Sequence, residues 1–359
     1  MRNSIFTLES YKKSINLLYK KNYTNKQYKK IYINIIAKKK PIILDKDFIN
    51  WLVGFTDAKG NFLIRLKGLD DDKYNSLNLI FHITLHKSDL YVLKYIRDKL
   101  NCGSISESGD KCNYFVNDQK SLINVILPIF NNVELKSSKY FQWLVFKNAV
   151  NLLIGKNHLT PRGKMEILQY YHEIKIVNKN YKARENMVIN KCWLIGFTEG
   201  DGCFGANKLK PELKYENHIK EFELVKSIFN YLNHGNLYTS NKKYTGFVSL
   251  EINNINILMN FIIPFFSKGM LTKKALDFKY WSIIVEITYY GYHTLLQGIE
   301  LINLIKSNIN NFRLKTDAII DHDEYKNLIE KKRNNLLSLP SPYEIKNGIM
   351  FIRGTDKLV

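Results

Sequence analysis

The spacing of hydrophobic residues alternates between helical and strand-like periods along residues 47–153. An apolar run at helical spacing is followed by two runs with strand-like alternation, NFLIRL and LNLIFHITL. The charged, turn-rich stretch KGLDDDKYNS lies between these two runs and predicts a hairpin loop. This order, αββαββα, predicts an α+β fold. The predicted elements are a helix over 47–58, strands over 62–68 and 77–85, a helix over 89–100, strands over 103–108 and 112–117, and helices over 120–127 and 139–153.

Capping signals indicate where some of these helices begin and end. Asp89 predicts the start of a helix that Gly103 is expected to stop. A further helix is predicted in HLTPRGKMEILQYYHEI, where Thr160 would be the N-cap and Pro161 would occupy the first turn.

The same pattern occurs twice in the chain. WLVGFTDAKG (51–60) returns as WLIGFTEGDG (193–202), 142 residues later. Matching order at nearly constant spacing indicates two copies of one fold. Because the offset then falls by ten and Pro211 interrupts a weak alternation, the second hairpin is expected to be short or distorted. Three further pairs recur at offsets of 132 to 135: LKYIRDKLNCGSI with VKSIFNYLNHGNL, KYFQWLVF with KALDFKYW, and HLTPRG with HTLLQG.

The repeat sets the expected domain boundaries. The Pro-punctuated stretch LPSPYEIKNG near the end of the chain is expected to be a loop. The expected parts are a basic N-terminal extension over 1–44, a first domain over 45–173, a basic linker over 174–190, a second domain over 191–330 and a C-terminal tail over 331–359.

Charge narrows the class of partner. The chain has 54 Lys and Arg against 33 Asp and Glu, a formal net charge of +21 spread along its length. Such a charge favours a polyanion, so nucleic acid is the leading partner. No apolar run of about 18 residues is present, which argues against a membrane protein. The four cysteines form no CxxC pair or zinc spacing, so we expect reduced and mostly buried thiols in a reducing compartment.

Each repeated motif ends in glycine, Gly60 or Gly202, after an apolar helical run. We expect these glycines to adopt the left-handed turn that ends a helix, which makes Lys59 and Asp201 the last helical residues. A carboxylate at that end faces the negative end of the helix dipole. Asp201 therefore requires a nearby cation, and a divalent metal would serve.

Two further glycines, Gly54 and Gly196, lie in the middle of the motif helices. Each costs about 1 kcal/mol of helix stability relative to alanine. What they offer is close approach, which lets the two helices pack backbone to backbone across a pseudo-twofold axis. That packing would place the side chains of Lys59 and Asp201 next to each other.

The two motifs resemble the LAGLIDADG motif, and residues 45–315 resemble a double-motif LAGLIDADG homing endonuclease or intron-encoded maturase. The resemblance implies two pseudo-twofold-related halves in one chain, each with a saddle-shaped antiparallel sheet that lies in the major groove of a long DNA site. It also implies Mg2+-dependent phosphodiester hydrolysis, a monomer and a mitochondrial location. Supporting blocks are FHITLHKSD, SSKYFQWLVFK, TKKALDFKYW, HLTPRGK and KPELKYENHIKE.

The resemblance also assigns candidate site residues. The metal-binding acid of the second motif is Asp201, with the backbone carbonyl of Gly200 beside it. Lys59 stands at the first-motif position where the family has Asp or Glu. The basic residues near the scissile phosphate correspond to Lys139 and Lys274, with Lys136 and Lys273 as alternatives. His86, His158 and His293 are expected to be structural.

Lys59 leaves three hypotheses about function. A lysine here would repel Mg2+ and could pair with Asp201 directly, since two unit charges about 4 Å apart interact by about 4 kcal/mol at an effective dielectric near 20. The first hypothesis is an endonuclease by descent that binds double-stranded DNA but cuts slowly, cuts one strand or does not cut. The second is an RNA maturase that assists splicing of its group I host intron. The third is a non-catalytic nucleic-acid-binding protein.

Overall fold

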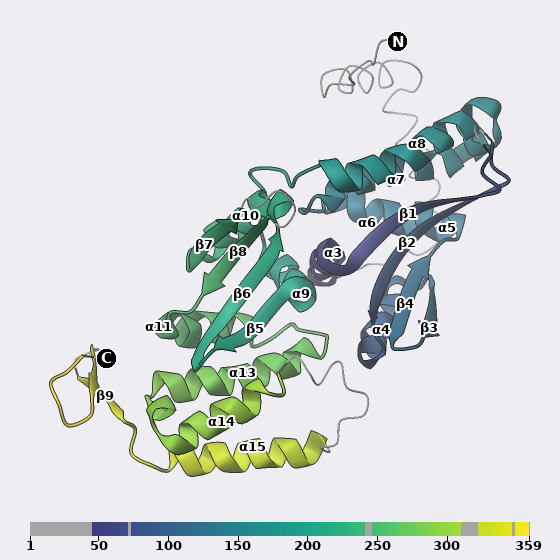
Figure 1. Ribbon diagram of the computed structural model, residues 1–359. Helices are drawn as coiled ribbons and strands as arrows, with labels where there is room; N and C mark the ends of the chain where they lie inside the picture. The colour runs from purple at the N-terminus through teal and green to yellow at the C-terminus, as the bar shows by residue number, and fades with distance from the viewer. Residues whose placement is uncertain (1–44, 71–72, 241–245, 310–321, 347–348, 359) are drawn as a thin grey trace. The chain divides into compact units, whose positions relative to one another are not determined.

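Two helices of the repeated motifs lie side by side between two four-stranded sheets (Figure 1). The computed structural model describes residues 45–359 except 71–72, 241–245, 310–321, 347–348 and 359. Asp45–Val359 forms one compact unit, and the expected basic extension over 1–44 lies outside the described residues.

The first half of the chain follows the predicted order. Its sheet has the strand order β1-β2-β4-β3, with all neighbours antiparallel. The elements are α3 (Lys46–Lys59), β1 (Gly60–Lys67), β2 (Ser76–His86), the 3-10 turn η1 (Lys87–Asp89), α4 (Leu90–Leu100), β3 (Ser104–Ser108), β4 (Lys111–Val116), α5 (Gln119–Ser121), the π-helical turn η2 (Leu122–Ile126), α6 (Leu127–Asn132), α7 (Lys139–Leu153), η3 (Ile154–Leu159) and α8 (Pro161–Asn180).

The second half repeats this arrangement, with the strand order β5-β6-β8-β7. The prediction of two α+β copies of one fold is therefore confirmed. Its elements are α9 (Lys191–Asp201), β5 (Gly202–Asn207), β6 (Lys210–His218), η4 (Ile219–Glu221), α10 (Phe222–Leu232), β7 (Asn236–Ser240), β8 (Phe247–Ile252), α11 (Ile255–Ile257), η5 (Leu258–Ile262), α12 (Ile263–Phe266), α13 (Lys274–Tyr289), η6 (Tyr292–Thr294) and α14 (Leu296–Lys306).

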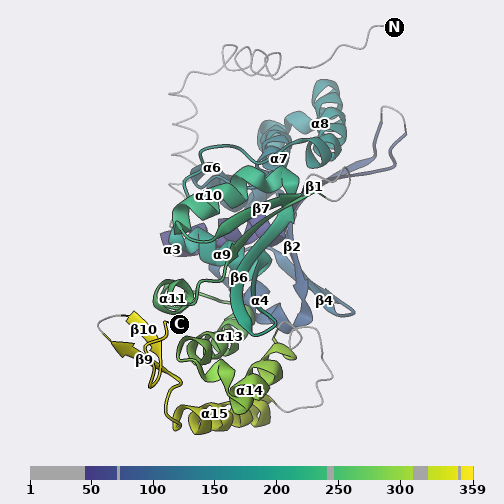
Figure 2. The same cartoon turned by 60° about the vertical axis from the view of Figure 1, so that its left-hand side comes forward.

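Each sheet has one face covered by helices that share an aromatic core. In the first half, Phe62 lies 5.2 Å from Trp143 of α7, measured between ring centroids. In the second half, Phe204 lies 5.1 Å from Trp281 of α13. Alternate residues of the central strands are buried, so the intervening side chains belong to the other face. Figure 2 shows helices on one side of each sheet.

The second hairpin is short, as predicted, but it is not distorted. Asn207 of β5 pairs with Lys210 of β6, whereas Lys67 of β1 pairs with Ser76 of β2 across a longer loop. Pro211 stands in β6 beyond the residues that pair with β8, so its missing N–H removes no bond to that strand.

Both predicted helix starts are confirmed, and one predicted helix stop is corrected. Thr160 caps α8, since its Oγ1 accepts a hydrogen bond from Gly163 N at 3.0 Å, and Pro161 follows it. Asp89 precedes α4, but its side chain makes no capping bond to that helix. Asn101, with φ of 51°, takes the left-handed turn immediately after α4. The helix therefore stops before Gly103 is reached.

The end of the chain departs from the expected loop. Tyr343–Lys346 forms strand β9, which pairs antiparallel with β10 (Ile349–Ile352), so the loop prediction for LPSPYEIKNG is wrong over β9. Helix α15 (His322–Leu337) precedes this hairpin, and α8 extends into the predicted linker.

Two expectations drawn from composition concern the cysteine thiols and membrane-spanning helices. Cys112 is buried and Cys102 and Cys192 are half-buried, but Cys203 is exposed, so burial of the thiols is incomplete. None of the helices in the described part of the chain combines the length and apolar character that a membrane crossing requires.

Candidate active site at the paired helix ends

The motif helices α3 and α9 touch through their backbones. A Cβ atom added at Gly54 would lie 2.0 Å from the carbonyl oxygen of Trp193, and one at Gly196 would lie 2.1 Å from that of Trp51. A Cβ atom at Gly200 would lie 2.2 Å from the Cβ of Ala58, so contact continues to the ends of both helices. The side chains at these ends are therefore forced together.

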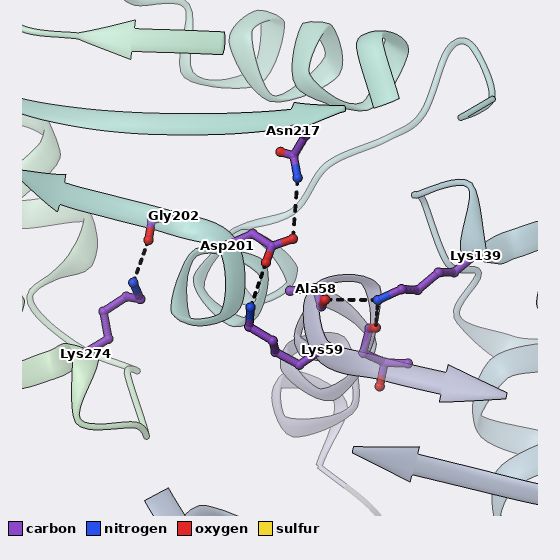
Figure 3. Close-up of polar contacts among 8 residues, drawn as sticks. Ala58, Lys59, Lys139, Asp201, Gly202, Asn217 and Lys274 are labelled. Atoms are coloured by element: carbon purple, nitrogen blue, oxygen red, sulfur yellow. Dashed lines mark hydrogen bonds and ion pairs between the residues drawn. The ribbon is translucent and has the colours of Figure 1, made fainter. Parts of the chain in front are cut away.

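Lys59 and Asp201 are the last residues of α3 and α9, and they form an ion pair. Lys59 Nζ lies 3.1 Å from Asp201 Oδ1, and Asn217 Nδ2 lies 3.5 Å from Asp201 Oδ2 (Figure 3). The side chain of Lys59 is 41% exposed and that of Asp201 is 23% exposed, so solvent and a ligand can reach the pair. The cation that Asp201 requires at a helix C-terminus is thus supplied by the chain itself.

The glycines after these helices do not make the predicted left-handed turn. Gly60 has φ of −78° and Gly202 has φ of −74°, both in the extended region. Space explains the glycines instead. A Cβ atom would lie 2.4 Å from Thr56 Cγ2 at the first site and 2.6 Å from Thr198 Cγ2 at the second. The chain passes directly from helix into strand.

Lys139 and Lys274 direct their ammonium groups at the same helix ends. Lys139 Nζ donates to the carbonyl oxygens of Ala58 at 3.0 Å and Thr56 at 3.3 Å, and Lys274 Nζ donates to that of Gly202 at 2.5 Å (Figure 3). Burial lowers the pKa of Lys139, while the nearby carboxylate of Asp201 raises it. Both lysines are the first residues of their helices, α7 and α13.

The alternative lysines have other contacts. Lys136 Nζ lies 5.8 Å from the centroid of the Trp193 ring. Lys273 donates its backbone N–H to Asp89 Oδ1 at 2.9 Å. Two of the histidines that were expected to be structural contact atoms near them in the chain. His86 Nδ1 accepts a hydrogen bond from Ser88 N at the start of η1, and His158 Nδ1 lies 3.3 Å from the carbonyl oxygen of Leu152.

Comparison with known proteins identifies the family. The model of the LAGLIDADG endonuclease family matches residues 52–150 and 194–285, which together make up more than half of the chain. The chain belongs to the LAGLIDADG endonuclease family. Both matched segments begin within a motif helix and contain one complete four-stranded sheet.

Individual relatives match most of the chain. The uncharacterized mitochondrial protein RF1 of Saccharomyces cerevisiae is 28% identical, over 96% of this chain and 77% of that protein. Probable intron-encoded endonuclease 2 of Neurospora crassa is 26% identical, over 76% of this chain and 67% of that protein. The solved structure of I-SmaMI bound to an uncleaved DNA target in the presence of calcium ions has the same fold, with a TM-score of 0.64 and 24% identity over 73% of this chain and 98% of that one.

Few carboxylate groups are available to hold a metal ion at the ends of the two LAGLIDADG helices. Within the described residues, no group of three or more His, Cys, Asp and Glu side chains is arranged to hold a metal ion. Asp201 already faces Lys59 Nζ through Oδ1 and Asn217 Nδ2 through Oδ2. This set fits one hard cation on Asp201 after the Lys59 ammonium moves away, and it does not fit two.

The register of the sheets shows a second difference between the two LAGLIDADG halves. Gly60 pairs with Ile83 and Gly202 pairs with Tyr215, so Leu85 in β2 corresponds to Asn217 in β6. The polar neighbour of Asp201 therefore has an apolar counterpart in the first half. Sequence reasoning missed Asn217 because the strand register that brings it beside Asp201 could not be fixed from the sequence.

Two buried acids of the LAGLIDADG motifs were also missed. Asp57 accepts hydrogen bonds from Trp193 Nε1 at 2.8 Å and from the backbone N–H groups of Lys136 and Ser137.

Glu199 corresponds to Asp57 in the second motif. It accepts from Trp51 Nε1 at 2.6 Å and from the backbone N–H groups of Leu271, at 2.7 Å, and Thr272. The signal was present in the sequence, because both motifs keep a carboxylate at this position.

The burial of Asp57 predicts a pH-dependent contribution to stability. Burial raises the pKa of Asp57 above its ordinary value of 3.8, although hydrogen bonds from Ser137, Lys136 and Trp193 oppose the shift. The folded state then holds more protons than the unfolded state, so this contribution is complete below about pH 3.8 and is lost as pH rises through the folded pKa. We expect wild type to lose stability relative to Asp57→Asn as pH rises from about 4 toward 7.

Urea unfolding of both proteins across this pH range measures the trend. The Asp98→Asn variant is a control, because the side chain of Asp98 is 65% exposed and its removal should leave the difference from wild type flat. A wild type that gains stability relative to Asp57→Asn as pH rises would contradict the assignment.

Proposed function

We propose that this chain is an intron-encoded LAGLIDADG homing endonuclease by descent that binds a long, specific double-stranded DNA site and cuts only one strand, slowly. The observation that carries the proposal is the 3.1 Å contact between Lys59 Nζ and Asp201 Oδ1 at the paired helix ends. One half keeps its motif acid, whereas the other has a lysine in its place. The mitochondrial relative supports a mitochondrial location.

The sheets offer side chains suited to reading base edges in a major groove. In β1 and β2, Arg65 pairs with Asn78 on the face that α7 does not cover. In β6, Lys214 contacts Glu216 at 2.8 Å and Glu251 of β8 at 3.1 Å. Donors and acceptors of this kind match the pattern that base pairs present in the major groove. The net charge of +21 supplies attraction to phosphates.

The residues at the helix ends have distinct proposed roles. Asp201 would hold the catalytic cation and orient the attacking water, and the backbone carbonyl of Gly200 would be a further ligand. Lys139 and Lys274 face the scissile phosphates and stabilise the charge that develops on them in the transition state. A divalent ion such as Mg2+, when bound, supplies Lewis acidity and lowers the pKa of a bound water. Lys59 neutralises Asp201 and so opposes binding of that ion.

A supercoiled plasmid that contains the homing site distinguishes the possible activities. With Mg2+ or Mn2+, the unaltered chain should convert it slowly to nicked circles rather than to linear DNA. Fast double-strand cutting would overturn the proposal. Tight binding to the site without nicking would favour the non-catalytic DNA-binding hypothesis.

Loss of the remaining acid should abolish the nicking activity. We expect Asp201→Asn to reduce nicking by about 100-fold or more, since it removes the carboxylate that is proposed to hold the cation. The Glu300→Gln variant is the control, because it changes an exposed carboxylate of α14 that belongs to neither sheet. Equal nicking by Asp201→Asn and wild type would show that the activity arises elsewhere.

The alternative function is that of an RNA maturase for a group I host intron. The Lys59 exchange removes a catalytic acid without reducing the basic charge on which RNA binding would depend. Binding and splicing assays with the intron that flanks the reading frame test this alternative. Affinity no higher than for unrelated RNA would exclude it.

A further inference from the structure

Two buried carboxylates stand at the N-cap positions of helices that they do not cap. Asp89 immediately precedes α4 and Glu221 immediately precedes α10, and neither side chain bonds to its own helix. They are equivalent residues of the two halves, 132 positions apart, as are the helices that follow them. Both are more than 90% buried, so each carboxylate requires a partner in the interior.

Each carboxylate finds that partner in the opposite half. Glu221, from the second half, accepts a hydrogen bond from Ser138 N at 3.0 Å and another from Ser138 Oγ. Asp89, from the first half, accepts one from Lys273 N at 2.9 Å. Ser138 is the N-cap of α7 and Lys273 is the N-cap of α13. Each acid therefore accepts a hydrogen bond from the residue that begins a helix of the opposite half.

The capped residues lie directly before the lysines at the candidate active site. We define residues 136–139 and 271–274 as the two lysine loops. Asp57 holds the first loop from within its own half, through Lys136 N and Ser137 N, and Glu199 does the same for the second. Asp89 and Glu221 add a contact from the opposite half.

We propose that Asp89 and Glu221 are positioning residues that set Lys274 and Lys139, respectively, from across the interface between the halves. A carboxylate at a helix N-terminus is favoured by the helix dipole, and bonds to charged acceptors are strong. The position of each lysine thus depends on docking of both halves. Only a docked pair presents both ammonium groups to the helix ends.

The electrostatic environment of Lys139 agrees with this role. Burial lowers the pKa of Lys139, and the carboxylates of Asp201, Asp57 and Glu221 oppose that shift. Glu221 therefore helps to keep Lys139 cationic as well as to fix the start of its helix. The relevance to cleavage rests on the proposed function, but the crossed contacts themselves do not.

Hydrogen exchange of the protein without DNA tests the crossed pattern separately from any nuclease activity. Glu221→Gln should speed amide exchange in residues 136–139 by about tenfold or more and leave 271–274 unchanged, because it weakens bonds to a charged acceptor. Asp89→Asn should have the reverse effect. Controls are Glu223→Gln and Asp98→Asn, which alter carboxylates on the same two helices, α10 and α4.

Competitive acetylation then measures how readily the side-chain amino groups of Lys139 and Lys274 react. Glu221→Gln should increase the labelling of Lys139 but not of Lys274, and Asp89→Asn should do the opposite. A purely local structural role would loosen the half that carries the mutation. Exchange or labelling that changes only in that half, equally in both loops or in neither loop would overturn the proposal.

Discussion

Lys59→Glu is expected to raise DNA cleavage by about 100-fold or more and to convert nicking into double-strand cutting. The exchange places a carboxylate beside Asp201, where the two helix ends already lie in contact. Two adjacent carboxylates would attract divalent ions that the Lys59 ammonium would repel, and one preorganised charge of this kind is worth about 100-fold to 1000-fold in rate. Conversion of a supercoiled plasmid to linear DNA in Mg2+ measures the gain.

The control for this gain is Lys59→Gln, which removes the positive charge without adding a ligand. It should cleave only slightly faster than wild type. If Lys59→Glu cleaves no faster than Lys59→Gln, the missing acid is not what limits the reaction. Helix α3 should lose about 0.3 to 1 kcal/mol of stability in Lys59→Glu, because an anion replaces a cation at its C-terminus.

Gly54→Ala is expected to lower the free energy of unfolding by about 3 kcal/mol or more, the largest loss among the substitutions proposed here. The new Cβ would meet backbone, 2.0 Å from the carbonyl oxygen of Trp193, so the two helices must separate. Ordinary overpacking costs about 1 to 3 kcal/mol, and backbone has less freedom to move away than a side chain. Thermal and urea unfolding measure the loss, and DNA cleavage should fall with it as the helix ends move apart.

Gly205→Ala is the matched control within a strand. There the nearest atom to an added Cβ is Cys203 Sγ at 3.7 Å, an ordinary contact, so the substitution should be tolerated. A Gly54→Ala protein as stable as Gly205→Ala would mean that α3 and α9 can separate freely. The close contact would then not define the site.

The contact between the motif helices was predictable because the residues that make it lie within one short motif that occurs twice. Gly54 and Gly196 stand at matching places in two copies of one motif, and Lys59 and Asp201 end those helices. A pseudo-twofold axis that runs along the two helices brings equivalent ends together, as the contact between Lys59 and Asp201 shows. The order of strands and helices in each half followed for the same reason, since hydrophobic period is a local property.

The sequence was less informative where packing or strand pairing overrides a local signal. The extended φ of Gly60 could not be inferred from its position after a helix, because crowding by Thr56 rather than a left-handed turn requires glycine there. Strand β9 also formed within a stretch that Pro and Gly mark as a loop.

The sequence by itself determined the repeat, the α+β order and the pairing of a lysine with an aspartate at the ends of the two motifs. Only the tertiary structure decided what the other carboxylates do. Asp89 looks like the cap of its own helix, yet its partner is Lys273, 184 residues away. A buried carboxylate bonds to whichever donors the docked halves bring to it, and that choice is made by packing and not by neighbours in the chain.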